Sequence, residues 1–300
     1  MRILITGATG LIGQEITRLC HLKGISVNYL TTSKNKIKNE PEYKGFYWNP
    51  ASGEIDTACF KGVGVVLNLA GENVFQRWTR AAKKRILNSR LRSAELLYKC
   101  LKDSDHQIDQ VVAASAIGVY PSSYKKMYFE DEKVTATDFL GKVVVQWEAA
   151  NDRFTDLGIK VAKIRTGLVL ARDEGALPKM QMPFKFNAGS PLGNGKQWQS
   201  WIHVTDLARM YIHVFENGLT GVYNGVAPNP LRNYEIMVEV GASMNRKIWL
   251  PNVPPIALKF AMGSMSSMVL SSQLVASKKI EDTGFKFGYT SFSKALKDLK

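Results

Sequence analysis

The chain has 300 residues, 45% hydrophobic and 22% charged, which is ample apolar material for a large core. Its net charge of +14 is spread along the sequence without interleaved aromatic residues, which argues against nucleic-acid binding and favours attraction to phosphorylated small molecules. Three cysteines without CxxC spacing predict no disulfide or metal site, and no apolar run approaches the roughly 20 residues of a membrane span, so we expect a cytoplasmic protein with no membrane partner.

Apolar, β-branched segments alternate with helix-length segments over the first half of the chain. Near-continuous apolarity is typical of strands that are buried on both faces, as in a parallel sheet covered by helices. From about residue 171 the pattern changes to loops rich in glycine and proline. The predicted strands lie at 3–6, 27–31, 63–70, 110–115 and 161–165, and the longest predicted helix covers 80–102.

This alternation predicts an α/β fold with a doubly wound parallel sheet of the Rossmann type and a smaller C-terminal α+β lobe. We place the nucleotide-binding domain at residues 1–170 and expect residues 200–228 to pack back onto it. The remaining residues, 171–199 and 229–300, are expected to form a substrate lobe that closes over the crevice.

The first predicted strand runs directly into a glycine motif, ITGATGLIG, at residues 5–13. Glycines between a strand and a helix let backbone amides approach a pyrophosphate at the positive end of the helix. The alternative is a tight turn without a ligand, but the place of the motif behind the first strand favours a dinucleotide. The residues expected to contact it are Gly7, Thr9, Gly10, Leu11, Ile12 and Gly13.

The end of the next predicted strand distinguishes between the two dinucleotides. An NAD site needs a carboxylate there for the ribose hydroxyl, whereas an NADP site needs hydroxyls and cations for the 2′-phosphate. The sequence LTTSKNKIK has no acid before Glu40, and Thr32, Ser33 and Lys34 are suitable phosphate donors. A solvated loop of ordinary lysines is the alternative, and NADP is favoured.

A further group of small residues, NLAGENV at 68–74, closes the next strand of the expected sheet. A small Ala-Gly pair at the carboxyl end of a strand lets the backbone pass close to the adenine and ribose of a bound cofactor. We therefore expect Leu69, Ala70, Gly71 and Glu72 to belong to the cofactor site.

These blocks together resemble a known family. TGATGLIG, NLAGE, ASAIGVY, RTGLVL and SWIHVTDLA are similar to the extended short-chain dehydrogenase/reductase superfamily, and within it to the epimerase family of nucleoside-diphosphate-sugar epimerases and SDR39U-type proteins. The similarity covers almost the whole chain, including a tail at 226–233 and 271–287 that looks like the distinctive C-terminal domain of that branch. The resemblance implies a Rossmann-like fold, bound NADP and a nucleotide- or sugar-like substrate.

The resemblance also exposes a departure from the superfamily pattern. Its members use a Tyr-x-x-x-Lys pair on one helix face for proton transfer, because four residues make about one helical turn. The matching stretch here, DFLGKVVVQWEAA, is a predicted helix that carries Leu140 and Val144 at those positions, or Phe139 and Val143 after a shift of one residue. Lys142 fits neither register and is interpreted as a solvent-facing lysine.

Other residues could supply the proton. Ser115 in ASAIGVY matches the serine block of the superfamily, and Tyr120 follows closely, so both are catalytic candidates; a serine at a strand end also commonly forms a turn. The literal pair Tyr98 and Lys102 stands on the long helix before that strand, and we interpret it as a coincidence.

Two classes of function stay open. The first is an NADP-dependent epimerase or oxidoreductase that acts on a small-molecule substrate with an unconventional proton donor, and the retained cofactor blocks and full lobe favour it. The second is a non-catalytic NADP-binding sensor or interaction protein, which the missing Tyr and Lys favour. The sequence predicts no nucleic-acid partner and leaves the substrate and the oligomeric state open.

Overall fold

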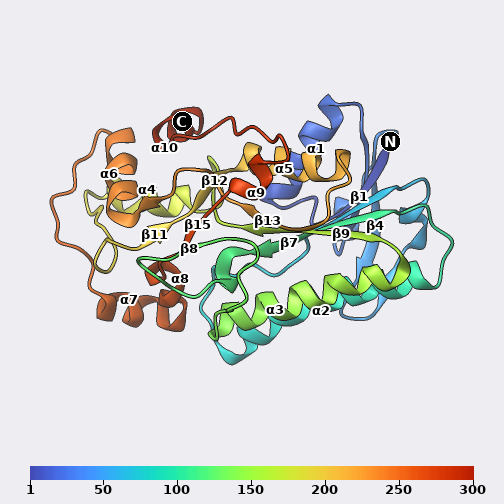
Figure 1. Cartoon of the computed structure of the whole chain (residues 1–300), viewed down its shortest axis with the longest axis horizontal. Helices are drawn as coiled ribbons and strands as arrows, with labels where there is room; N and C mark the ends of the chain where they lie inside the picture. Colours follow the sequence, from blue (N-terminus) through green and yellow to red (C-terminus); the bar gives the residue numbers. More distant parts are fainter.

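The computed structural model describes residues 1–300 (Figure 1). One half of the molecule is a nine-stranded sheet with helices on both faces, which confirms the predicted doubly wound fold. The main path runs β13-β9-β7-β6-β1-β2-β4-β3, and every pair is parallel except β3 with β4 and β4 with β5 at the edge. The strands are β1 (Arg2–Thr6), β2 (Ser26–Thr31), β3 (Asn39–Glu40), β4 (Tyr43–Asn49), β5 (Glu54–Ile55), β6 (Val65–Asn68), β7 (Gln110–Ala116), β9 (Lys160–Thr166) and β13 (Gly221–Gly225).

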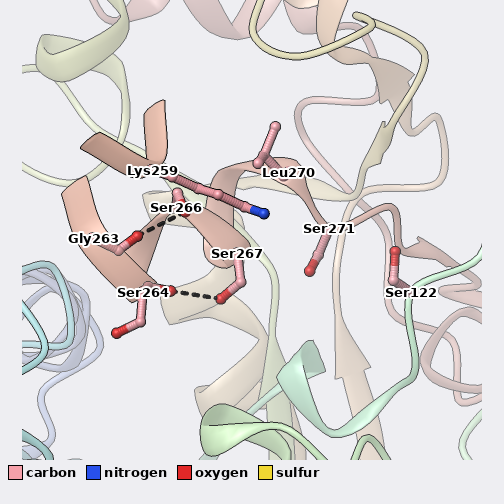
Figure 2. A pocket seen from close by; sticks show the side chains of 8 residues that line it. All are labelled: Ser122, Lys259, Gly263, Ser264, Ser266, Ser267, Leu270 and Ser271. Atoms are coloured by element: carbon pink, nitrogen blue, oxygen red, sulfur yellow. Dashed lines mark hydrogen bonds between the residues drawn. The ribbon is translucent and has the colours of Figure 1, made fainter. Parts of the chain in front are cut away.

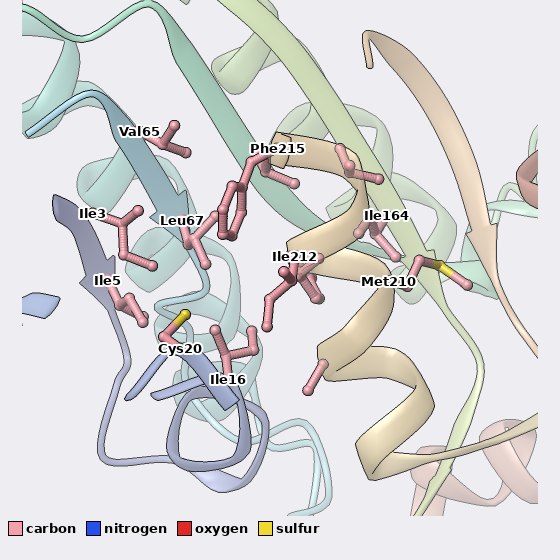
Figure 3. Packing of buried hydrophobic residues seen from close by; sticks show 14 of the residues in the cluster. Ile3, Ile5, Ile16, Cys20, Val65, Leu67, Ile164, Met210, Ile212 and Phe215 are labelled. Carbon is pink, nitrogen blue, oxygen red and sulfur yellow. The ribbon is translucent and has the colours of Figure 1, made fainter. Parts of the chain in front are cut away.

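The central strands are apolar on both faces because both faces are covered. Ile3 and Ile5 of β1 lie in the core beneath α1 (Leu11–Leu22) and α5 (Val204–Glu216), whereas Leu4 lies in a second core on the opposite face. Figure 3 shows the first of these cores, in which the β1 side chains face those of the two helices. This two-sided burial is the physical reason for the near-continuous apolarity of the strand sequences.

Two long helices, α2 (Arg80–Lys102) and α3 (Phe139–Asp152), lie together on the other face of the sheet (Figure 1). Both begin at side-chain caps. Thr79 Oγ1 accepts the Ala82 amide at 3.1 Å, and Asp138 Oδ1 accepts the Gly141 amide at 2.8 Å. The helix predicted for DFLGKVVVQWEAA is therefore present, and its cap is the first residue of that stretch.

The chain returns to the sheet after residue 200. β12 (Trp201–His203) leads into α5, which packs against α1, and β13 then pairs with β9 at the sheet edge. His203 itself caps α5, since its Nδ1 accepts the Thr205 amide at 3.2 Å. The division of the chain into a nucleotide-binding domain and a substrate lobe stays a prediction.

The smaller lobe lies at the far end of the sheet from the N-terminus (Figure 1). Its core gathers around the buried rings of Phe184, Trp201 and Phe292. No helix in the chain combines the length and apolarity that crossing a bilayer requires. The helices of this lobe are α4 (Leu177–Lys185), α6 (Asn233–Ser243), α7 (Pro255–Met262), α8 (Ser266–Leu270) and α10 (Phe292–Asp298), and its short paired strands are β8 (Met127–Tyr128), β10 (Leu168–Leu170), β11 (Trp198–Gln199), β14 (Leu231–Arg232) and β15 (Leu274–Val275). The short helix α9 (Lys278–Glu281) packs against β13 of the large sheet instead, where Ile280 joins the first core.

Candidate cofactor and substrate site

The turn between β1 and α1 has the shape that a dinucleotide pyrophosphate requires. Gly7 has a φ of 74°, which glycine adopts readily, and its carbonyl accepts the Gly10 amide at 3.0 Å. A Cβ on Gly13 would lie 2.3 Å from the Gly7 carbonyl oxygen. Helix α1 begins at Leu11 with no side-chain cap and no acid in its first turn. Its first N–H groups are therefore free to hold a phosphate, which fits the predicted cofactor.

The residues next to this turn lead to a cavity of about 380 Å³ at the carboxyl ends of the central strands. Thr9 and Gly10 are exposed, Leu11 is half-buried, and Ile12 lines the cavity. The Thr9 carbonyl accepts from Gln14 Nε2 at 2.8 Å, which ties the turn to the first turn of α1. The glycine turn thus lies next to the cavity, because Ile12 belongs to both.

The loop after β2 carries the residues predicted to choose the dinucleotide. Thr32 and Lys34 are exposed and Ser33 is half-buried, and none of the three side chains is paired with a carboxylate. The Lys34 ammonium lies 5.0 Å from the centre of the Tyr47 ring, beside the end of the sheet. The loop therefore presents hydroxyl and ammonium donors to solvent, which suits a 2′-phosphate better than a diol.

Strand β6 ends at Asn68, two residues before the end of the predicted strand. The backbone amides of the next two residues donate to a side chain instead. The Thr6 hydroxyl donates to Asn68 Oδ1 at 3.0 Å and accepts the Leu69 and Ala70 amides at 2.9 and 3.0 Å. A Cβ on Gly7 would lie 3.3 Å from the Leu69 backbone. The segment after β6 consequently passes directly beside the glycine turn.

The last two residues of the predicted cofactor segment are directed toward α2. A Cβ on Gly71 would lie 3.0 Å from the guanidinium carbon of Arg90. The Glu72 carboxylate accepts from Gln76 at 3.2 Å and lies 3.4 Å from Arg85. Glu72 is not part of the cavity wall, and its role toward a cofactor stays a prediction.

A cavity of about 380 Å³ lies beyond the carboxyl ends of the central strands, where β6, β7 and β9 meet the smaller lobe. The two halves of the chain both contribute to its wall. Open α/β sheets bind ligands at this edge. The wall consists of Ile12, Leu69, Val74, Arg90, Ala114–Gly118, Asp138, Leu140, Val143, Val144, Trp147, Thr166–Leu168, Trp198–Ser200, Ser267, Met268, Ser271 and Gln273.

Ser115 reaches this cavity from the end of β7, but its hydroxyl is already engaged. The hydroxyl donates to Glu148 Oε1 at 2.5 Å. Glu148 in turn accepts two hydrogen bonds from Arg165, at 2.8 Å from Nε and 2.9 Å from Nη2. Burial acts to raise the pKa of Glu148, and the bonds and charge of Arg165 more than offset it, so the net shift is downward. Ser115 therefore stands between the cavity and a buried ion pair.

Tyr120 lies behind that ion pair and not on the cavity wall. Its ring is 1% exposed and stacks on Tyr128. The hydroxyl accepts from Arg165 Nη1 at 2.9 Å and donates to Asn224 Oδ1 at 2.8 Å. Burial raises the pKa of Tyr120 even though Arg165 opposes the shift, so the phenol stays protonated at neutral pH. The catalytic role expected of Tyr120 stays a prediction.

Helix α3 gives the cavity an apolar face. Leu140, Val143 and Val144 all line the cavity, whereas Lys142 on the same helix is exposed to solvent. The literal pair Tyr98 and Lys102 is absent from the wall; the Tyr98 ring packs against Phe154 at a centroid distance of 6.0 Å. No tyrosine or lysine lines the cavity.

A second cavity of about 500 Å³ adjoins the first, because Ser267 and Ser271 line both. Figure 2 shows five serine side chains around the aliphatic stem and ammonium of Lys259, which points toward the middle of the group. Two of these serines are satisfied locally: Ser266 donates to the Gly263 carbonyl at 2.7 Å and Ser267 to the Ser264 carbonyl at 3.0 Å. This polar cavity belongs to α7, α8 and the loop around Ser122.

A family model described as the NAD dependent epimerase/dehydratase family matches residues 3–225 of the chain. The chain belongs to this family. A second model, a Domain of unknown function (DUF1731), matches residues 253–299, which contain α7, α8 and α10. The tail resemblance noted in the sequence is thereby confirmed for residues 271–287, whereas residues 226–233 lie outside both matched ranges.

Members of the epimerase family cover the whole chain. The Epimerase family protein SSP1921 of Staphylococcus saprophyticus is 34% identical over 300 residues, which span 99% of this chain and 98% of that protein. The Epimerase family protein YfhF of Bacillus subtilis is likewise 34% identical, over 100% of this chain and 98% of that protein.

Solved structures of the epimerase family share the fold. The human epimerase family protein SDR39U1 (isoform 2), solved with NADPH, has a TM-score of 0.86 at 31% identity and covers 100% of this chain and 99% of its own. A nucleoside-diphosphate sugar epimerase from Corynebacterium glutamicum has a TM-score of 0.79 at 27% identity, over 99% of this chain and 57% of that one. A UDP-N-acetylglucosamine 4-epimerase from Bacillus cereus, at 17% identity, shows the fold alone.

Several cavity residues were not anticipated from the sequence. Arg90 had a signal, because it continues the buried stripe of α2 that runs through Ile86 and Ala94 at spacings of four residues. Gln273 had none: its Nε2 donates to the Ile117 and Tyr120 carbonyls at 3.0 and 2.7 Å, contacts that only the folded chain creates.

Proposed function

We propose that the chain is an NADP(H)-dependent epimerase or oxidoreductase that lacks the usual Tyr-x-x-x-Lys pair and acts on a small nucleotide- or sugar-like substrate in the cavity of about 380 Å³. The observation that supports it is continuity: Ile12 belongs both to the glycine turn that fits a pyrophosphate and to the cavity wall. A cofactor held by the turn would therefore lie next to the cavity that takes the substrate.

NADP is favoured over NAD because hydroxyl and ammonium groups follow β2 where an NAD site needs a carboxylate. The relative solved with NADPH supports the same choice. Calorimetry with NADPH and NADH tests it, and NADPH is expected to bind more tightly. Lys34→Glu is expected to weaken NADPH about tenfold or more, since a charge-assisted hydrogen bond of roughly 1.5–3 kcal/mol becomes a repulsion, while NADH is unaffected. Equal affinities of the wild type for the two would refute the assignment.

In this proposal the bound cofactor supplies hydride transfer at its nicotinamide, and the chain's own residues position the substrate. The apolar wall of α3 excludes water from the reacting groups. The oxygen of Ser115 can accept a hydrogen bond from a substrate hydroxyl, because its own proton is donated to Glu148. Proton transfer would then run from the substrate to Ser115 as the Ser115 proton moves to Glu148.

Such a relay is weak. The net downward shift of the Glu148 pKa makes it a poor base, and the raised pKa of Tyr120 keeps that phenol from acting as one. With Leu140 and Val144 in the cavity wall, α3 brings no tyrosine or lysine to the cavity, and the Asp138 carboxylate at its N-terminus accepts the Gly141 amide as the helix cap. Turnover of ordinary alcohols and nucleotide sugars is therefore expected to be slow, because positioned acid–base catalysis contributes about 10²- to 10⁴-fold.

The double variant Leu140→Tyr with Val144→Lys tests this reading. It is expected to raise turnover of simple carbonyls and nucleotide sugars with NADPH above the wild-type rate, because it places an acid–base pair one helical turn apart at the cavity. The matched control is Lys142→Ala on the exposed side of the same helix, which is expected to change nothing. Fast wild-type turnover that persists in Ser115→Ala and Tyr120→Phe variants would show that the active site lies elsewhere.

The alternative function is a non-catalytic NADP-binding sensor or interaction protein. The engaged hydroxyl of Ser115 and the apolar α3 wall favour it, since neither is arranged for efficient proton transfer. Single-turnover measurements with NADPH and a panel of carbonyls separate the two functions. Cofactor oxidation that depends on Ser115 supports the enzyme; tight NADPH binding without oxidation of the cofactor by any member of the panel supports the sensor.

A further inference from the structure

Arg90 is a buried cation on the wall of the candidate substrate cavity. Its side chain comes from α2 and is 9% exposed. The guanidinium carbon lies 4.8 Å from the centre of the Trp147 ring, which comes from α3, and both residues line the cavity. Two neighbouring helices thus bring one positive charge and one indole to the same place.

Most of the hydrogen-bonding capacity of this pair is unused. Arg90 Nη1 donates to the carbonyls of Ile86 and Glu72 at 2.9 and 3.1 Å, whereas Nε and Nη2 donate to no atom of the chain. The Trp147 Nε1 is fully buried and also lacks an acceptor. Buried donors without acceptors are rare in folded proteins because they cost free energy, so the Trp147 indole N–H points to an acceptor that binds. The Nε and Nη2 groups of Arg90, a residue of the cavity wall, have no partner in the chain either and could donate to the same acceptor.

The charge of Arg90 also lacks a counterion. No carboxylate of the chain lies within 4.0 Å of it, and the neighbouring acid, Glu72, pairs with Arg85 instead. Burial lowers the pKa of Arg90 to about 10, which leaves the guanidinium charged at neutral pH. A buried cation without a partner is unfavourable, and an anionic ligand would remove that penalty.

We propose that the cavity binds its substrate through an anionic group, a carboxylate or a phosphate, that accepts hydrogen bonds from the Arg90 guanidinium and from the Trp147 indole N–H. This inference rests on the proposed function in one respect, namely that the cavity takes the substrate. Nε and Nη2 are parallel donors that match two oxygens of either group, and the indole N–H supplies a third donor. The apolar residues of α3 then face the uncharged remainder of the molecule.

The cofactor itself is a second source of the same chemistry, since it carries phosphates. The N-terminus of α1 and the glycine turn already provide for its pyrophosphate, and the loop after β2 provides for a 2′-phosphate. Arg90 is therefore assigned to the substrate, and NADPH affinity is the measurement that separates the two sources.

The test follows the indole N–H of Trp147 by ¹⁵N-NMR, with Trp147→Phe to assign its signal. Wild-type protein without cofactor is titrated with sodium acetate and, separately, with sodium phosphate, against sodium chloride at equal ionic strength. Acetate or phosphate is expected to shift the signal saturably while chloride does not, and the probe that saturates first identifies a carboxylate or a phosphate site. Arg90→Gln is expected to weaken this binding about tenfold to a hundredfold, and Arg90→Lys to a smaller extent because it keeps the charge but loses the paired donors.

Arg92→Gln, an exposed position on the same helix, is the matched control and is expected to titrate like the wild type. Thermal unfolding establishes that each variant is folded; if Arg90→Gln is not, Arg90→Lys carries the comparison. The absence of a shift in the wild type, or an equal titration in every Arg90 variant, would overturn the proposal.

NADPH calorimetry on the same variants completes the test. Arg90→Gln or Arg90→Lys is expected to bind NADPH within about threefold of the wild type, whereas a loss of tenfold or more would assign the anion to the cofactor and overturn the assignment to the substrate. Because the acetate and phosphate titrations need neither cofactor nor turnover, their outcome is independent of whether the proposed NADP-dependent chemistry holds.

Discussion

Replacing Arg165 by methionine would remove one half of the buried ion pair behind the cavity. Its guanidinium holds Glu148 through two hydrogen bonds of 2.8 and 2.9 Å, and the side chains of the pair are 9% and 11% exposed. In Arg165→Met the Glu148 carboxylate would keep only the Ser115 hydroxyl as a donor. The variant therefore isolates the cost of a buried, unpaired carboxylate.

Removal of one partner from a buried pair costs about 3–5 kcal/mol, because the remaining charge has lost its compensation. Arg165→Met is expected at the upper part of that range. The side chain also donates to the Tyr120 hydroxyl at 2.9 Å, so a second buried group loses a partner. Replacing both members, as Glu148→Gln with Arg165→Met, is expected to cost less than the sum of the two single changes.

The pH dependence of this loss has a definite sign. In the wild type the folded-state pKa of Glu148 is lowered, so the pair contributes its full stability above the unfolded-state pKa and loses it only as the pH falls through the folded value. Without Arg165, burial dominates and raises the folded-state pKa of Glu148. The variant then regains stability as the pH falls and the carboxylate takes up a proton, so its deficit is largest at pH 8 and shrinks toward pH 5.

Urea unfolding followed by tryptophan fluorescence at pH 8 and pH 5 measures both quantities. The matched control is Lys163→Met, two residues earlier on β9, where the partner Asp152 keeps 52% of its side chain exposed and can be solvated by water. Its cost is expected near 1 kcal/mol. A loss below about 1 kcal/mol for Arg165→Met, or a deficit that does not change with pH, would refute the assigned role of the pair.

One single variant and one double variant test the cofactor turn and the literal Tyr-x-x-x-Lys. Gly13→Ala is expected to abolish NADPH binding in calorimetry, since its Cβ would lie 2.3 Å from the Gly7 carbonyl oxygen and force the turn open. The control Gly64→Ala, whose Cβ meets no atom within 4 Å, should bind NADPH normally. Unchanged affinity in Gly13→Ala would contradict the role of the glycine turn in cofactor binding. Tyr98→Phe with Lys102→Ala is expected to leave NADPH affinity and any turnover unchanged, and a loss of turnover in a stable double variant would place the active site on α2.

The central strands and both long helices could be predicted because the positions of apolar residues in their sequences match the positions that are buried in the structure. The helix predicted at 80–102 is observed at those residues, and the segment 161–165 lies within β9. Strand β4, next to the edge of the sheet, was missed, since its sequence YKGFYWN is mostly half-buried and mixes aromatic with polar residues. β13 was missed because glycines stand at both of its ends, Gly221 and Gly225, which weakens any strand pattern.

The cofactor turn was accessible to sequence reasoning because glycine spacing encodes its shape locally. The substrate cavity was not, since residues 198–200 and 267–273 reach it from the smaller lobe through contacts that no local pattern records. The Ser115 block was recognised, but the engagement of its hydroxyl depends on Glu148 and Arg165, which come from two other elements. The glycine turn and Ser115 could thus be predicted from local sequence, whereas the residues that contact them in the folded chain could not.

The position of β13 at the edge of the sheet has a consequence for synthesis on the ribosome. Strand β13 (residues 221–225) is the last strand of the sheet, and α5 packs against α1 on one of its faces. Residues 171–199, which precede both elements in the sequence, leave the exit tunnel before them. A nascent chain that ends at residue 170 would expose Ile16, Cys20 and Ile164 to water, because Met210 and Phe215 are still untranslated (Figure 3). The sheet can therefore be completed only after part of the smaller lobe has been synthesised. Until then the chain exposes an apolar surface to which chaperones could bind.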